Sequence, residues 1–151
     1  MAQYQKAVRA FLAAASKTKD LNRVVDGCRL ISAEKGKLQV EMEVSKECSN
    51  MFGTLHGGCT ATLIDVLTSA ALVGNRGVDD GVSVDMHMTY AAAAKEGETI
   101  LINAEVVKEG RSMAFLRADI FRKSDQALVA TGLHTVALID VSKVNKNLKH
   151  G

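Results

Sequence analysis

The sequence of 151 residues contains no proline and only three cysteines. No proline-rich, repetitive or low-complexity stretch separates one part of the chain from another, so we expect a single domain over residues 1–151. The cysteines Cys28, Cys48 and Cys59 are odd in number and are not closely paired in the sequence. This pattern argues against a disulfide framework and favours a reducing compartment.

Strong charge of one sign and long apolar runs are also missing. The formal net charge is +2, which is too small to indicate a nucleic-acid surface, and 47% apolar with 24% charged residues is typical of a globular protein. The longest apolar runs end well before the ~20 residues that a membrane span needs. We therefore expect no nucleic-acid partner and no integral membrane association.

Acidic residues are absent from the first 19 positions, which hold four cations. The apolar residues Val8, Phe11, Leu12 and Ala15 fall at helical spacing. This segment predicts a surface helix over about residues 3–17, and a weak mitochondrial presequence is the alternative. We expect the core over about residues 24–140 and a solvated basic tail over 141–151. Cytoplasmic and mitochondrial locations both stay open.

Alternating polarity predicts the strands. Leu38, Val40 and Met42 point one way while their polar neighbours point the other, which is typical of a half-exposed antiparallel strand. Short turns favour antiparallel pairing, and one apolar helix is expected to pack inside the sheet. The expected elements, in order after the first helix, are strands 29–34 and 37–44, a helix 57–73 stopped by Gly74-Asn75, and strands 82–90, 99–108, 112–122 and 128–138.

The expected strand 82–90 carries apolar and polar side chains on opposite faces. Its polar face holds Ser83, Asp85, His87 and Thr89. Strict alternation therefore predicts that Ser83 opens a polar stripe facing away from the apolar side. Long strands with uncovered edges also favour edge-to-edge pairing, so we expect a homo-oligomer with a sheet continuous across the interface.

A single carboxylate stands in the most apolar part of the chain. Between Cys48 and Asn75 the only formally charged side chain is Asp65, and a carboxylate there is costly to bury. The same helix opens at Gly57-Gly58, directly after His56. Backbone N–H groups at a helix start have no partner inside the helix, and the macrodipole favours negative charge there. One element thus carries an acid and an anion-stabilising start.

Several segments resemble one family of enzymes. Segment 50–58 reads NMFGTLHGG and segment 60–65 reads TATLID, which is similar to the signature of hotdog-fold acyl-coenzyme A thioesterases. Further matches, in order and spacing, point to the thioesterase superfamily member 2 group within that family. They are GVSVDM at 81–86, Tyr90, AKEGE at 94–98 and KEGRSMAF at 108–115, and the likeness covers about residues 5–138.

The resemblance implies an α+β hotdog fold, in which an antiparallel sheet wraps around a central hydrophobic helix, here with an extra N-terminal helix. It implies hydrolysis of medium- to long-chain fatty acyl-coenzyme A thioesters to a free fatty acid and coenzyme A, without a metal or organic cofactor. Asn50 and Gly57 would polarise the thioester carbonyl. Asp65 would activate a water or attack directly, and Ser83 would help to place that water. His56 receives a supporting role.

One helix cannot aim Gly57 and Asp65 at the same atom, because eight residues of α-helix span roughly 12 Å. A site shared between two subunits is therefore expected, as the resemblance also implies, and monomers should be inactive. By resemblance alone we expect a tetramer of two dimers. Cations are expected near the phosphates of coenzyme A. The candidate substrate-contacting residues are Lys46, Asp85, Tyr90, Lys95, Lys108, Gly110, Arg111, Ser112 and Met113.

Other interpretations stay open. A glycine pair also starts closely packed helices, a buried Asp65 would also satisfy backbone amides, and the cations would also serve as ordinary surface charge. A non-catalytic acyl-coenzyme A binding module and a hotdog acyl-coenzyme A hydratase are the alternative functions. The hydratase needs a histidine and an aspartate acting together, whereas His56 and Asp65 face different turns. The histidines and cysteines lack metal-ligand spacing, so we expect no metal site.

Overall fold

The computed structural model describes residues 2–77 and 81–139, so the basic tail expected at 141–151 lies outside the described residues. The predicted helices and strands are all present, and their ends differ by at most one residue from prediction except at the end of the central helix. The elements are α1 (Ala2–Ser16), the 3₁₀ helix η1 (Leu21–Gly27), β1 (Arg29–Glu34), β2 (Lys37–Glu43), the 3₁₀ turn η2 (Lys46–Cys48), α2 (Gly57–Arg76), β3 (Gly81–Tyr90), β4 (Thr99–Glu109), β5 (Met113–Arg122) and β6 (Leu128–Leu138).

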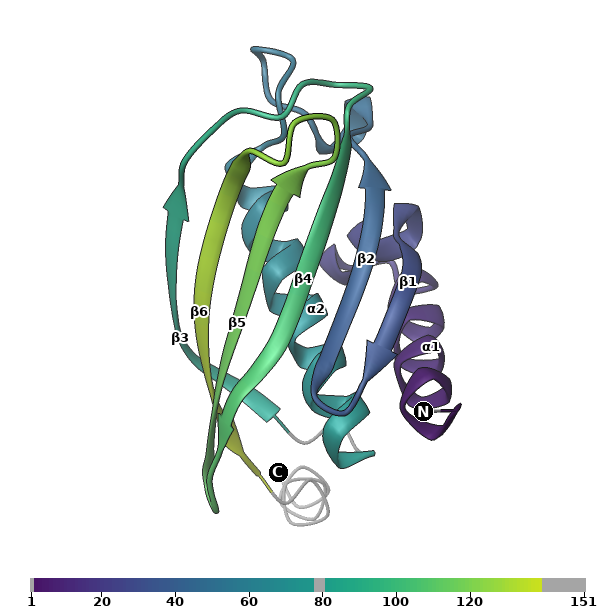
Figure 1. Cartoon of the computed structure of the whole chain (residues 1–151), viewed down its shortest axis with the longest axis vertical. Helices are drawn as coiled ribbons and strands as arrows, with labels where there is room; N and C mark the ends of the chain where they lie inside the picture. The colour runs from purple at the N-terminus through teal and green to yellow at the C-terminus, as the bar shows by residue number, and fades with distance from the viewer. Residues whose placement is uncertain (1, 78–80, 140–151) are drawn as a thin grey trace, which may run out of the picture.

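The six strands form one antiparallel sheet in the order β1-β2-β4-β5-β6-β3. Figure 1 shows this sheet curving around α2, with α1 beside β1. The arrangement confirms the expected α+β fold, with a central helix inside an antiparallel sheet and an additional N-terminal helix. β3 joins the sheet at the far edge, next to the last strand in the sequence, and this places its residues beside the first half of α2.

The core lies between α2 and the inner face of the sheet. Alternation along β2 is as predicted, since Leu38, Val40 and Met42 are buried and the residues between them face outward. Leu63 and Ile64 of α2 are fully buried against this face. α2 has the length and apolar composition of a membrane-crossing helix, and 61% of its most apolar stretch is buried inside the fold. Its role as the core helix accounts for that composition.

The predicted end of the central helix is wrong. α2 continues past Gly74-Asn75 to Arg76 and ends at Gly77, whose φ of +78° is a left-handed conformation that glycine adopts without strain. Gly74 instead serves as a contact point, because a Cβ there would lie 2.9 Å from Cγ2 of Val8 in α1. This glycine lets the two helices approach closely, and nothing in the local sequence distinguishes that use from a helix stop.

The predicted facing of Ser83 is also wrong. The register of β3 against β6 shifts between Ser83 and Asp85, so Val84 is an extra, bulged residue. Ser83 pairs with buried Val136, whereas Asp85 pairs with the outward Thr135. Because paired residues of neighbouring strands share a face, the bulge turns Ser83 inward and leaves Asp85 outward. Ser83 therefore points toward α2 rather than along a common polar stripe.

The free edge of β3 is long and unprotected. β3 runs for ten residues without lysine or proline, and Val82 and Val84 on it are 48% and 55% exposed. The opposite edge strand, β1, is shorter and carries charged side chains at both ends. Asp85 is the one formally charged side chain on β3, and long, exposed edges with so few charges tend to pair with another strand. β3 is therefore the edge best suited to the continuous intersubunit sheet that the sequence predicts.

Candidate active site

The first turn of α2 carries backbone N–H groups that have no partner among the described residues, and that of Gly57 is the first of them. Nδ1 of His56 accepts a hydrogen bond from the N–H of Gly58 at 2.8 Å, which caps the helix. Within the described residues the N–H of Gly57 donates to no other group, while its carbonyl accepts a bond from the Tyr90 hydroxyl at 3.1 Å. The cap uses the neighbouring donor and fixes the backbone, so the Gly57 N–H is left to face a ligand with partial negative charge.

The loop before α2 holds Asn50 in a fixed orientation. Its Oδ1 accepts bonds from the backbone N–H groups of Phe52 at 2.9 Å and Thr54 at 3.2 Å, and its Nδ2 donates to the Thr54 hydroxyl at 2.9 Å. Two backbone donors identify which atom is the oxygen. An amide nitrogen carries two hydrogens, so Asn50 retains one donor beyond those that close the loop.

Asp65 lies two turns further along α2 and is not sealed in the core. Its side chain is 43% exposed, and its Oδ1 accepts a hydrogen bond from the Ser83 hydroxyl at 3.2 Å. The bulge in β3 makes this contact, because it turns Ser83 toward the helix. A half-exposed carboxylate with one ordered hydroxyl beside it has the reach and the free lone pairs that a base acting on water requires.

His134 is a member of this cluster that the sequence reasoning missed. Its Nε2 lies 2.9 Å from Oγ of Ser83 and 3.5 Å from Oδ1 of Asp65, and its Nδ1 lies 2.7 Å from Oγ1 of Thr68. The side chain is completely buried at an inward position of β6. The sequence did contain a signal for this residue, because the alternation of strand 128–138 places His134 among the inward, apolar positions. Thr68, His134, Ser83 and Asp65 thus form a continuous series of polar contacts. It joins α2, which carries Thr68 and Asp65, to β6 and to the edge strand β3.

The structure brings some predicted site residues together and separates others. Asp65 and Ser83 are in contact, as are Tyr90 and Gly57, and Lys95 pairs with Thr54 just ahead of α2. The hairpin 108–113 lies at the other end of the sheet, where Glu109 accepts a bond from Asn75 in the last turn of α2 (Figure 1). Because α2 has 20 residues, the two ends are about 30 Å apart. Within one protomer, the predicted coenzyme A contacts near the start of α2 and those on the 108–113 hairpin thus lie at opposite ends of the sheet.

The chain matches known proteins over most of its length. A profile of the thioesterase superfamily matches residues 52–129. Human acyl-coenzyme A thioesterase 13 is 42% identical over 135 residues, which cover 89% of this chain and 96% of the human protein. The chain belongs to the thioesterase superfamily. The crystal structure of zebrafish thioesterase superfamily member 2 superposes with a TM-score of 0.83 at 42% identity, covering 89% of this chain and 97% of that one.

A more distant structural neighbour has been solved with a ligand. The Streptococcus mutans protein bound to acetyl-coenzyme A is 26% identical, with a TM-score of 0.69 over 74% of this chain and 88% of that one. Among residues 2–77 and 81–139, no three histidine, cysteine, aspartate or glutamate side chains are grouped as a metal site requires. The chemistry that the described side chains offer is that of a carboxylate, a hydroxyl, an imidazole and amide donors.

Buried His134 gives this thioesterase-family chain a specific pH dependence. Burial lowers the pKa of His134 below its usual 6.5, and the carboxylates of Asp65 and Asp85 oppose the shift without reversing it. As the pH falls, His134 therefore takes up a proton in the unfolded state before it does so in the folded state. The stability that neutral His134 contributes is present above the unfolded pKa and is lost as the pH falls below it.

We expect the melting temperature of the wild type to fall on acidification from about pH 7.5 to about pH 5.5, and to fall less in His134→Gln, because glutamine does not titrate. Circular dichroism melts of both proteins at the two pH values measure the difference. Glutamine retains a donor and an acceptor for the Thr68 and Ser83 hydroxyls. The comparison therefore measures the effect of protonating His134 rather than the loss of its hydrogen bonds. An equal decrease in melting temperature between the two pH values in both proteins would contradict this assignment.

Proposed function

We propose that this chain hydrolyses fatty acyl-coenzyme A thioesters to free fatty acids and coenzyme A, with no metal or organic cofactor. The observation that carries the proposal is the half-exposed Asp65, bound by Ser83, on the same helix that begins with the unpaired Gly57 N–H. The human relative named acyl-coenzyme A thioesterase 13 supports the same substrate class. A base and a carbonyl-polarising donor are the minimum equipment for hydrolysis of a thioester.

The residues divide the chemistry as follows. The Gly57 N–H and the free Nδ2 hydrogen of Asn50 donate to the thioester oxygen and stabilise its developing negative charge. Asp65 accepts a proton from a water while the water oxygen bonds to the carbonyl carbon, and Ser83 holds that water in place. The tetrahedral adduct then breaks its C–S bond. Asp65 passes the proton that it took from the water to the departing sulfur, so coenzyme A leaves as the thiol and the fatty acid remains.

The two halves of the site come from different subunits in this proposal. Ser83, near the start of β3, contacts Asp65, and Tyr90, at the end of β3, contacts Gly57. Antiparallel pairing of β3 with the same strand of a second copy, about a two-fold axis between Met86 and His87, places Ser83 opposite Tyr90 of the partner subunit. Asp65 of one protomer then faces the helix start of the other.

The same two-fold symmetry would bring the two groups of predicted coenzyme A contacts close together across the interface. The helix start of one protomer, with Lys46 and Lys95 nearby, lies toward the end of the partner that carries its 108–113 hairpin. Lys108 and Arg111 on that hairpin are exposed and suit the phosphates of coenzyme A. Two such dimers would form the tetramer expected by resemblance. A cytoplasmic or mitochondrial location fits this activity and the lack of a disulfide framework.

A direct assay of thiol release tests the proposal. We expect the purified wild type to release free coenzyme A from acyl-coenzyme A substrates of medium and long chain length, measured with a chromogenic thiol reagent against a blank that contains enzyme alone. The blank accounts for the three cysteines of the chain. Tight binding without thiol release would support the non-catalytic binding module instead. Addition of water to an enoyl-coenzyme A without thiol release would support the hydratase, and either result would refute hydrolysis.

A further inference from the structure

A large cavity opens beside the start of α2. Its volume is about 790 Å³, within the range of ~300–1,000 Å³ that encloses drug-sized molecules. Residues from the segment 16–27, the end of β2, the loop before α2 and the first two turns of α2 line it. The segment 16–27 precedes the residues 52–129 that the superfamily profile matches. One wall of this cavity is therefore built by a part of the chain that lies outside the matched family region.

The cavity adjoins the candidate oxyanion site. His56 and Gly58 both line it, and they flank Gly57, whose N–H is unpaired among the described residues. A thioester carbonyl held at that N–H has two substituents, the coenzyme A sulfur and the acyl chain. Because His56 and Gly58 line the cavity on either side of Gly57, it is within reach of one of these two substituents.

The lining favours the acyl chain over the nucleotide. The apolar part of the wall is made by Leu21, Val24, Met42 and the thiols of Cys48 and Cys59, and hydroxyl side chains and His56 complete it. Burial raises the pKa of Cys59 to about 12, so its thiol is neutral and behaves as a small apolar group. At the rim, Asp26, Glu43 and Glu47 outnumber Arg23. The phosphates of coenzyme A would meet a net negative rim, whereas an alkyl chain can pack on the apolar part of the wall and carries no charge for the rim to repel.

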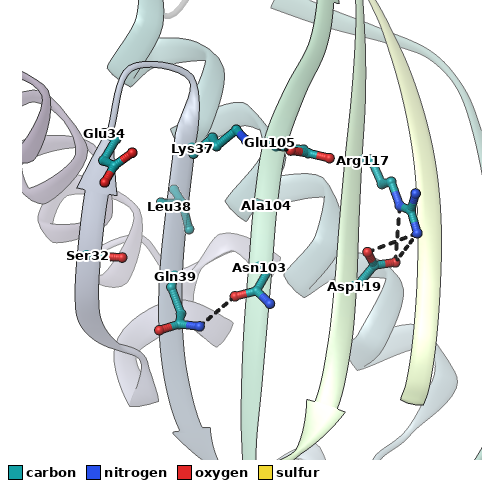
Figure 2. Close-up of a pocket in the computed structure, with 10 residues that line it drawn as sticks. All are labelled: Ser32, Glu34, Lys37, Leu38, Gln39, Asn103, Ala104, Glu105, Arg117 and Asp119. Atoms are coloured by element: carbon teal, nitrogen blue, oxygen red, sulfur yellow. Dashed lines mark hydrogen bonds and ion pairs between the residues drawn. The ribbon is translucent and has the colours of Figure 1, made fainter.

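A second cavity provides a contrast. It has a volume of about 320 Å³ and lies on the outer face of the sheet, where Figure 2 shows polar and charged side chains around it. Gln39 donates to Asn103, and Arg117 pairs with Asp119, so its polar groups satisfy one another. Only Leu38 and Ala104 add apolar side chains to this lining, and none of the residues around the outer cavity belongs to the helix start.

We propose that the 790 Å³ cavity is the pocket for the acyl chain, and that Val24 and Leu21 in η1 set the longest chain that it accepts. The proposal rests on the thioester hydrolysis proposed above, whose chemistry it leaves unchanged. Val24 is half-buried and packs on the core, and Leu21 is 75% exposed at the opening. Each methylene transferred from water to an apolar site contributes about a factor of four in binding, so the space beyond Val24 controls the preference for long chains.

Substitutions at the wall should change the chain-length profile. Val24→Phe takes the space of several methylene groups, so we expect it to lower kcat/KM for tetradecanoyl-coenzyme A by about tenfold relative to hexanoyl-coenzyme A. Val24→Ala should shift the ratio in the opposite direction. Leu21→Asp puts a charge at the opening without touching the core and should also depress the long-chain substrate selectively. Ser32→Phe, the matched small-to-large change in the outer cavity, should leave the ratio unchanged.

Thermal melts identify any variant that fails to fold. If Val24→Phe fails to fold, Leu21→Asp still tests the proposal, because Leu21 is exposed. A ratio that stays constant in all folded wall variants, or that changes equally in Ser32→Phe, would overturn the proposal. If the wild type releases no thiol at all, hydrolysis itself is refuted. The pocket is then tested alone by the binding of a fluorescent long-chain fatty acid, which Leu21→Asp should weaken and Ser32→Phe should not; equal binding would refute the pocket too.

Discussion

Replacing Asp65 by asparagine is expected to lower kcat/KM for acyl-coenzyme A hydrolysis by about 10²- to 10⁴-fold, the range typical of losing a general base. The amide keeps the shape of the side chain and an oxygen for the Ser83 hydroxyl, but it cannot take a proton from water at neutral pH. Thiol release under subsaturating substrate measures the loss. Because Asp65 is 43% exposed, we expect the variant to keep its fold and its melting temperature to change little.

Asp119→Asn is the matched control for Asp65→Asn. Asp119 accepts bonds from Thr131 and Arg117 on the outer face, so the change again neutralises a hydrogen-bonded carboxylate, but one that is remote from the helix start. We expect this control to keep wild-type turnover. Full activity in Asp65→Asn, or an equal loss in both variants, would remove Asp65 from the role of base.

Regular patterns in the sequence predicted most of the fold. The alternation of Leu38, Val40 and Met42 was readable because one face of β2 is buried and the other is solvated. The ends of the strands followed from turn residues, and the acid at position 65 stood out against an apolar helix. These features are local, so a single sequence carries them. The pattern alone predicted an anion-stabilising helix start at Gly57, and the resemblance supplied the role of Asn50 and the thioester carbonyl as the group that both donors polarise.

The parts of the site that the sequence did not predict depend on distant residues. A bulge at Val84 turns Ser83 inward, and strict alternation has no means of placing an extra residue in one strand. His134 meets Ser83 and Thr68 across separations of 51 and 66 residues. The helix stop at Gly74 was wrong because the contact that uses this glycine comes from Val8 in another helix. Sheet register and helix packing decided all three outcomes.

The sharing of the site between subunits predicts rescue in mixed dimers. A subunit with Asp65→Asn lacks the base, and a subunit with Gly57→Pro lacks the unpaired N–H. Proline suits this position because it is the first residue of α2, where the N–H has no helical partner, and because His56 before it is already extended at φ −66° and ψ 134°. Each homodimer should be nearly inactive, with losses of about 10²-fold or more.

Gly57→Ala is the control for the proline variant. A Cβ at position 57 would lie 3.5 Å from the ring of Tyr90, which is an ordinary contact, and alanine keeps the N–H. We expect Gly57→Ala to retain most of the activity that Gly57→Pro loses. This pair of variants assigns the effect of proline to the missing donor rather than to the added side chain.

The most direct test of the shared site is the activity of a purified hybrid dimer, made by co-expressing the Asp65→Asn and Gly57→Pro chains with different affinity tags and selecting for both tags. One of its two sites would combine the intact Asp65 of one chain with the intact Gly57 of the other. The account predicts about half of the wild-type thiol release per dimer. A hybrid as inactive as its two parent homodimers would contradict it and would place each site within a single chain.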